Sequence, residues 1–227
     1  SGETLEAINA SLCAAHTQLP RLRYLLLTWG TSYVYRLRET GEVVSNCHKL
    51  PERLFIRERV EVPTLLHIWT PLLQELLELQ PNLQLILTVS PVRHLRDGAH
   101  ANTLSKATLH LFTEELQRLF PDHVHYFPAY ELVLDELRDY RFYAEDMAHP
   151  STLTQRLVAE RFAGWALDGP TQRAFAEALR ITSELRHRPL HASTEAHTQR
   201  LERLTARVRD FLSRYPLAKL PLPEPHI

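Results

Sequence analysis

Hydrophobic positions along the chain alternate between the spacing of a helix and the continuous apolar runs of buried strands. Residues 3–19 carry apolar side chains at helical spacing, and residues 22–29 follow as a largely apolar run, which is typical of a strand buried in a parallel sheet. The same order recurs twice. It predicts helices at 3–19, 63–79 and 103–120, and buried strands at 22–29, 83–89 and 123–127. This alternation predicts an α/β domain with a parallel sheet and right-handed crossovers.

Two local features interrupt the alternation. Residues 33–37 and 42–45 flank Gly41, and this arrangement predicts a small hairpin after the first buried strand. A long loop at 90–102 follows the second buried strand. It lies at the carboxyl edge of the predicted sheet, where open α/β sheets bind their ligands.

The predicted sheet is incomplete, and the end of the chain is entirely helical. Three strands are few for such a domain, and no strand precedes the first helix. We therefore expect the N-terminal strands to lie outside this chain, as in a fragment of a longer protein. The later pattern predicts helices at 151–167, 171–187 and 193–215 and then a Pro-rich tail. We expect an α/β domain over residues 1–167 and a helical extension with its tail over residues 168–227.

Composition excludes several classes of protein. Hydrophobic residues make up 44% and charged residues 23% of the 227 residues, and the net charge is −1. These values are close to the globular average, so neither disorder nor nucleic-acid binding is expected. No apolar run approaches the roughly 18 residues of a membrane helix. The two cysteines, Cys13 and Cys47, have neither disulfide-framework nor metal-ligand spacing, which favours a reducing compartment.

The strongest candidate for chemistry is the pair Asp146 and His149, followed by Pro150. An Asp three residues before a His can fold back onto the imidazole, fix its tautomer and leave the other ring nitrogen free as a base. Taken alone, the spacing favours the alternative of a helix-capping Asp beside a surface His. Further motifs are needed to decide between these interpretations.

Six motifs, the last of which contains this pair, occur in a fixed order and together resemble the bacterial GSCFA family. The resemblance covers residues 22 to about 152. The motifs are LLTWGTSYVY at 26–35, VSNCHK at 44–49, ILTVSPVRHLRDG at 86–98, NTLSK at 102–106, YFPAYE at 126–131, and DELRDYRFYAEDMAHP at 135–150.

This family is similar to SGNH (GDSL-like) hydrolases, and the resemblance implies their three-layer α/β/α, flavodoxin-like fold. It also implies a Ser, Asp and His triad in which Asp146 orients His149 and His149 is the base. The family's Gly-Ser-Cys-Phe-Ala motif, which holds the presumed nucleophilic serine, is absent from these residues. We therefore expect the nucleophile to lie outside this chain and the chain alone to be inactive.

Other residues are candidates for binding the substrate or the oxyanion. Gly30 follows the first strand at the place where SGNH enzymes carry an oxyanion motif, and Asn46 is the candidate side-chain donor. Capping of the hairpin end is an equally favoured role for Asn46. His48 is a further candidate next to it. Arg93 and His94 either line a polar or anionic substrate pocket or belong to a solvated turn.

Three other pairings are disfavoured. Adjacent side chains of an extended segment point to opposite faces, so Cys47 and His48 do not form a dyad. Ser105 and Lys106 are adjacent on a helix and do not face each other. The 13 histidines lack the spacing of a zinc site. We expect no metal and no cofactor.

The sequence thus favours a serine-dependent ester hydrolase or acyl transferase of SGNH type. The expected substrate is a small-molecule, glycan or lipid acyl ester, and the expected location is the bacterial cytoplasm, with the envelope as the alternative. The rival hypothesis is a non-catalytic binding or interaction module that keeps the fold. Metal-dependent hydrolysis ranks last. The sheet edge that the absent strands leave exposed should be covered by a partner chain or a second copy, by the tail near residues 217–222, or by aggregation.

Overall fold

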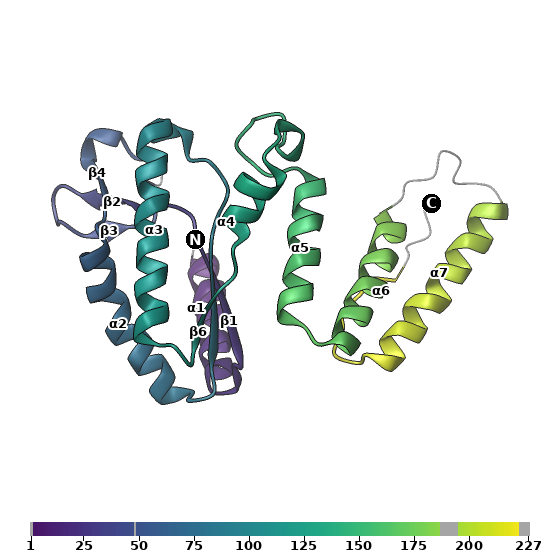
Figure 1. Ribbon diagram of the computed structural model, residues 1–227. Helices are drawn as coiled ribbons and strands as arrows, with labels where there is room; N and C mark the ends of the chain where they lie inside the picture. The colour runs from purple at the N-terminus through teal and green to yellow at the C-terminus, as the bar shows by residue number, and fades with distance from the viewer. Residues whose placement is uncertain (1, 48, 187–194, 223–227) are drawn as a thin grey trace. The chain divides into compact units, whose positions relative to one another are not determined.

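The computed structural model describes residues 2–47, 49–186 and 195–222, which form two compact units, Ser1–Val158 and Ala159–Ile227 (Figure 1). The candidate residues all belong to the first unit. The predicted boundary near residue 167 stays a prediction.

The first unit is built on the parallel sheet that the sequence predicts. Its strands are β1 (Tyr24–Trp29), β5 (Gln84–Val89) and β6 (Val124–Tyr126), in the spatial order β1-β5-β6. Both strand pairs are parallel. Because parallel strands end at the same edge, the segments after β1, β5 and β6 meet there.

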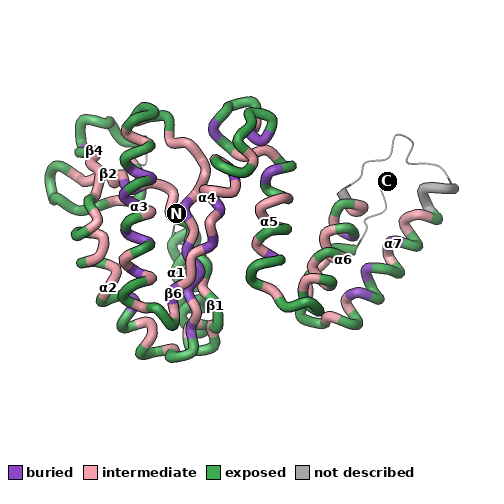
Figure 2. The backbone as a smooth tube through the Cα atoms, in the orientation of Figure 1, coloured by how far each residue is buried: buried purple, intermediate pink, exposed green. Residues whose placement is uncertain are grey.

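Helices flank this sheet, which is consistent with a three-layer α/β/α fold. The helices before β6 are α1 (Gly2–Gln18), α2 (Val62–Leu79) and α3 (Ala99–Leu119), with a 3₁₀ turn η1 (Leu19–Arg21) after α1. The core cluster joins α2, α3 and the strands through Leu73, Leu83, Leu85, Leu87, Phe112, Leu116 and Val124. Figure 2 shows buried residues on α3 and within the sheet, where they belong to β5 and β6.

The first strand differs from its prediction as a strand buried on both faces. β1 lies at the edge of the sheet, and its residues alternate between exposed and half-buried. Tyr24 is 57% exposed and Leu26 is 54% exposed. The apolar run was interpreted as full burial, but only one face of β1 packs against the core. The other face and the free edge are open in the described part of the chain.

A second, smaller sheet contains the predicted hairpin. Strands β2 (Tyr33–Leu37) and β3 (Val43–Val44) pair antiparallel, and Gly41, with φ of 74°, supplies the left-handed turn between them. A third strand, β4 (Phe55–Arg59), follows a 3₁₀ turn η2 (Glu52–Leu54) and pairs with β2. This strand is absent from the sequence prediction because charged residues dominate it.

The segment between β6 and the next long helix is also more structured than predicted. It contains α4 (Ala129–Glu131), a π-helical stretch η4 (Leu132–Leu137) and a 3₁₀ turn η5 (Tyr140–Phe142). The predicted loop at 90–102 is shorter, because a 3₁₀ turn η3 (Leu95–Asp97) leads directly into α3 at Ala99. Helix α5 (Thr152–Ala166) follows the candidate catalytic loop.

The second unit contains two helices that pack against each other, α6 (Gly169–Arg186) and α7 (Glu195–Arg214). The apolar stripe of α7 covers α6 through a cluster of Ile181, Leu204, Val208 and Phe211. In the described residues, no helix is both long and apolar enough to cross a membrane.

Candidate active site

The Asp146 and His149 side chains form the expected hydrogen bond. Asp146 Oδ2 lies 2.6 Å from His149 Nδ1, and Asp146 Oδ1 accepts the backbone N–H groups of Ala148 and His149, each at 2.9 Å. These backbone bonds, and then the bond from the imidazole, lower the pKa of Asp146 to about 2. An ionised carboxylate only accepts hydrogen bonds, so Nδ1 carries the proton and Nε2 is left as a base.

Local backbone geometry brings these two side chains together. Met147, between them, has a φ of 57°, and this left-handed residue reverses the chain. Tyr143 and Pro150 form an isolated antiparallel bridge below the turn, and the Ala144 N–H donates to the carbonyl of His149 at 2.8 Å. The Asp–His pair therefore stands at the tip of a closed loop, residues 143–150. Its side chains remain exposed to solvent.

Arg93 ties this loop to the segment that follows β5. Its backbone N–H donates to the Ala148 carbonyl at 3.2 Å, and Nη1 donates to the Met147 carbonyl at 3.1 Å. Its guanidinium carbon lies 4.2 Å from the centroid of the Tyr143 ring, in cation–π geometry. Arg93 thus makes three separate contacts with the loop at 143–150. It also borders a small cavity of about 140 Å³ beside the π-helical stretch.

Replacing Arg93 by alanine should loosen the loop. The lost hydrogen bond and cation–π contact are partly exposed, so we expect a local destabilisation of about 1 kcal/mol. This corresponds to roughly fivefold faster amide exchange at His149, whose N–H is bonded to Asp146. Hydrogen exchange measured by NMR checks this, with Arg38→Ala as the control because Arg38 bonds elsewhere, to Arg53. Equal exchange rates in both variants would contradict the role of Arg93.

Gly30 and the residues after β5 meet at the carboxyl edge of the sheet. His94 Nε2 lies 3.6 Å from the position that a Cβ on Gly30 would take. The Lys106 ammonium donates to the carbonyls of both Gly30 and Ser90, each at 2.6 Å. Since Arg93 is in the same segment as Ser90, Gly30 and the loop at 143–150 lie at one edge, as the parallel topology requires.

A network of hydroxyl groups holds the turn after Gly30. Ser105 Oγ accepts the backbone N–H of Ser32 at 2.8 Å, and it lies 3.1 Å from Ser32 Oγ and 3.0 Å from Thr31 Oγ1. Ser105 and Ser32 are both buried. The hydrogen bonds of these serines therefore hold the turn after β1 against α3. Ser105 and Lys106 bind different partners, as their adjacency on the helix predicts.

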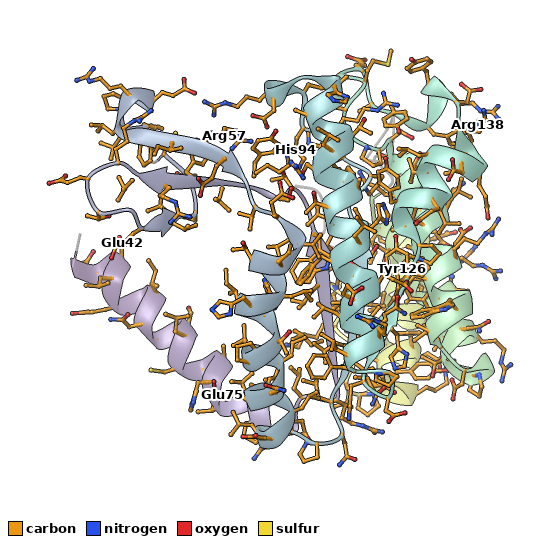
Figure 3. All side chains as sticks on the ribbon, turned by 60° about the vertical axis from the view of Figure 1, so that its left-hand side comes forward. Glu42, Arg57, Glu75, His94, Tyr126 and Arg138 are labelled. Carbon is orange, nitrogen blue, oxygen red and sulfur yellow. The ribbon has the colours of Figure 1, made fainter. Side chains whose placement is uncertain are left out.

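A pocket of about 520 Å³ opens beside this edge, between the small sheet and the β5–α3 segment. Figure 3 shows Arg57 and His94 in this region, next to α3. The lining residues are Thr31, Tyr33, Val34, Tyr35, Val43, Val44, Ser45, Arg57, His94 and Arg96. Among the predicted site residues that the structure describes, only His94 lines this pocket. Asn46 is exposed and follows the lining residue Ser45, whereas His48 lies outside the described residues.

The arginines of this pocket are held by carboxylates. Arg57 makes two hydrogen bonds of 2.6 Å to Asp97, which raises the pKa of Arg57 and lowers that of Asp97. Arg96 donates to Glu52 at 2.8 Å and to the Tyr35 hydroxyl. Sequence analysis assigned no role to Arg57, because β4 itself was not predicted. In the described part of the chain, no cluster of three or more His, Cys, Asp and Glu is placed to hold a metal ion.

Comparison with known proteins found a match to a family model, and it covers the first unit. The model of the GSCFA family matches residues 1–162. No curated protein and no solved structure matches the chain. The matched range contains Gly30, His94, Lys106 and the whole loop at 143–150.

Proposed function

The chain belongs to the GSCFA family, and we propose that it supplies the acid–base part of a serine-dependent ester hydrolase or acyl transferase of SGNH type. The observation that carries this proposal is the 2.6 Å hydrogen bond between Asp146 and His149. It orients the imidazole so that Nε2 can take a proton. This is the geometry that a general base needs before a serine can attack an ester.

In the proposed reaction, His149 Nε2 takes the proton of a serine hydroxyl as the serine oxygen bonds to the ester carbonyl carbon. The protonated imidazole then gives that proton to the leaving alcohol as the C–O bond breaks. Asp146 stays ionised and stabilises the imidazolium. In the second half of the reaction, His149 takes a proton from water or a second alcohol as that oxygen bonds to the acyl carbon. His149 then returns the proton to the serine oxygen as the acyl–serine bond breaks, which completes hydrolysis or transfer. We propose that Gly30, which follows β1, supports the developing oxyanion together with Asn46.

We place the nucleophilic serine outside these 227 residues. Two observations support this placement. The Gly-Ser-Cys-Phe motif is absent from the sequence, and in the described residues Asp146 is the only side chain bonded to His149. Ser32 and Ser105, near the end of β1, are buried and bonded to each other, and Ser90, directly after β5, accepts the backbone N–H of Val92 through its Oγ.

The open edge of β1 supports the same proposal. Unpaired strand edges with exposed apolar side chains invite pairing with another strand. Tyr24 and Leu26 are such side chains. We propose that protein outside these residues, in the same chain or in a partner, covers this edge. The substrate would be a small acyl ester, and the chemistry of this site requires no cofactor.

Ester turnover by two proteins tests the proposal. The natural protein that contains this chain should hydrolyse a short-chain aryl ester, whereas the 227 residues alone should not, because a base without a nucleophile has no bond-forming group to activate. Turnover by the 227 residues that is lost on replacing one of their own serines would show that the nucleophile is misplaced. Failure of both proteins would favour the rival function, a binding module using the pocket of about 520 Å³.

A further inference from the structure

The pocket of about 520 Å³ combines apolar and cationic side chains in its lining. The apolar side chains come from β2 and β3, and the cationic ones are Arg57 on β4 and Arg96 on η3. Hydroxyl groups and the His94 ring complete the lining, and among the described residues no Asp or Glu belongs to it. Cations without carboxylates in the lining favour a ligand with negative charge.

Arg57 is held in a fixed position at this pocket. Its Nε and Nη2 donate to the two carboxylate oxygens of Asp97, each at 2.6 Å. Its guanidinium carbon lies 5.0 Å and 4.8 Å from the ring centroids of Tyr33 and Tyr35. Paired and stacked in this way, the planar guanidinium is pre-organised for a ligand. Nη1 has no hydrogen-bond partner among the described residues, so it remains a donor for a ligand in the pocket.

Arg96 is held more loosely than Arg57. Its Nη1 donates to the Tyr35 hydroxyl, and its Nη2 donates to Glu52 at 2.8 Å. The side chains of Arg96 and Glu52 are 51% and 76% exposed, so water screens this ion pair and it contributes little. A ligand oxyanion can therefore replace Glu52 as the partner of Arg96 at small cost.

Lys106 adds a further positive charge at the end of the pocket. Its buried ammonium donates to the carbonyls of Gly30 and Ser90, and in the described residues it has no carboxylate partner. Thr31, directly after Gly30, belongs to the pocket lining. Together with the two lining arginines and the two carboxylates that bind them, Lys106 leaves one positive charge in excess among these five groups.

The pocket lies next to the residue that we propose to support the oxyanion of the reaction. His94, which lines the pocket, has its Nε2 3.6 Å from the position that a Cβ on Gly30 would take. Figure 3 shows His94 and Arg57 close to each other beside α3. A substrate whose reacting carbonyl lies at Gly30 can therefore extend along His94 towards the arginines.

We propose that this pocket binds an oxyanion, a carboxylate or a phosphate, which the ester substrate carries beside its reacting carbonyl. This inference rests on the proposed function, because it names a group of that reaction's substrate. Arg57 and Arg96 donate charge-assisted hydrogen bonds to the oxyanion. The apolar side chains of β2 and β3 contact the carbon skeleton that joins the oxyanion to the ester.

Binding of small anions by the 227-residue chain tests the proposal. Inorganic phosphate and acetate are titrated at constant pH, with sodium chloride keeping the ionic strength constant because salt screens charges. At least one of the two anions should cause saturable NMR shifts at the amides of Thr31, Ser45 and His94, with a Kd of about 1 to 10 mM. The anion that binds more tightly identifies the group. Glucose, a neutral polyol, should cause no such shifts.

Arg96→Gln removes one guanidinium at an exposed position, so the variant should fold, and it should weaken anion binding at least about fivefold. Arg38→Gln is the matched control, because Arg38 is exposed just after β2, bonds the Arg53 carbonyl and is not part of the lining. Absence of saturable shifts with both anions, or equal affinity in Arg96→Gln and the wild type, would overturn the proposal. Saturable shifts with glucose alone would overturn it as well.

Kinetics of the natural protein connect the anion site to the ester. An aryl ester that carries the tighter-binding anion should have a KM at least about fivefold lower than a neutral ester of the same length, and Arg96→Gln should remove this difference. Equal KM values would overturn the assignment of the anion to the substrate. The binding experiment uses no turnover, so an inactive natural protein would count against the hydrolase alone, whereas a lack of anion binding would leave the hydrolase proposal standing.

Discussion

Replacing His149 by alanine in the natural protein should lower kcat/KM for a short-chain aryl ester by about 10² to 10⁴-fold, the usual contribution of a positioned general base. Asp146→Asn should cost nearly as much. An asparagine amide cannot stabilise the imidazolium, and it can donate to Nδ1 and so select the wrong tautomer. The losses should appear in kcat, because neither side chain is proposed to bind the ester in its ground state.

The pH dependence of turnover tests the state of Asp146. Because the pKa of Asp146 is lowered to about 2, its carboxylate stays ionised well below neutral pH. A loss of activity on mild acidification therefore does not come from protonation of Asp146. His67→Ala, at an exposed histidine of α2, is the control and should be neutral. Full activity in His149→Ala, measured by steady-state kinetics, would remove His149 from the mechanism.

Replacing Phe112 by alanine should lower the free energy of unfolding of the first unit by about 3 to 5 kcal/mol. Phe112 is 1% exposed, and its ring centroid lies 5.6 Å from that of Trp29 and 6.5 Å from that of Trp69. Truncation leaves a cavity between α2, α3 and β1, because aromatic rings on both sides cannot collapse into the space.

The neighbouring residue supplies the control for this prediction. Leu111, on the same helix, is 61% exposed, so Leu111→Ala should change stability by no more than about 0.5 kcal/mol. Urea unfolding followed by tryptophan fluorescence measures both variants. Equal losses in the two variants would contradict the orientation of α3, and with it the placement of Ser105 and Lys106 at the sheet edge.

The sequence alone predicts the parallel sheet, but it does not predict which strand lies at the edge of the sheet with one face exposed. The run at 22–29 and the strand at 83–89 look alike in hydrophobicity. In the structure β5 is central and β1 is at the edge. The hydrophobic pattern of a segment indicates which of its residues can be buried. The position of a strand in the sheet depends instead on the strands with which it pairs.

The small sheet shows a second limit. Its hairpin carries a turn signal at Gly41 and is confirmed, whereas β4 has three charged residues in five and was missed. Those charges are paired: Glu58 binds Arg36 of the neighbouring strand β2 at 2.6 Å, Arg57 binds Asp97, and Arg59 binds Glu61. The strand therefore lacks the apolar alternation on which strand prediction depends.

The candidate site likewise contains one contact that the sequence predicts and another that it does not. The bond between Asp146 and His149 follows from local spacing, so the sequence predicts it. Lys106 acts through carbonyls that lie 76 and 16 residues away, and adjacency to Ser105 was the only signal considered for it.

The measurement that tests the central claim most directly is the rate at which a fluorophosphonate probe labels the natural protein, compared with His149→Ala and Asp146→Asn. The probe reacts with an activated serine and needs no substrate binding beyond the reacting centre. If His149 is the base and Asp146 orients it, labelling should slow by at least about 100-fold in both variants, and the label should map to a serine outside these 227 residues. Labelling at the wild-type rate in His149→Ala would contradict the account.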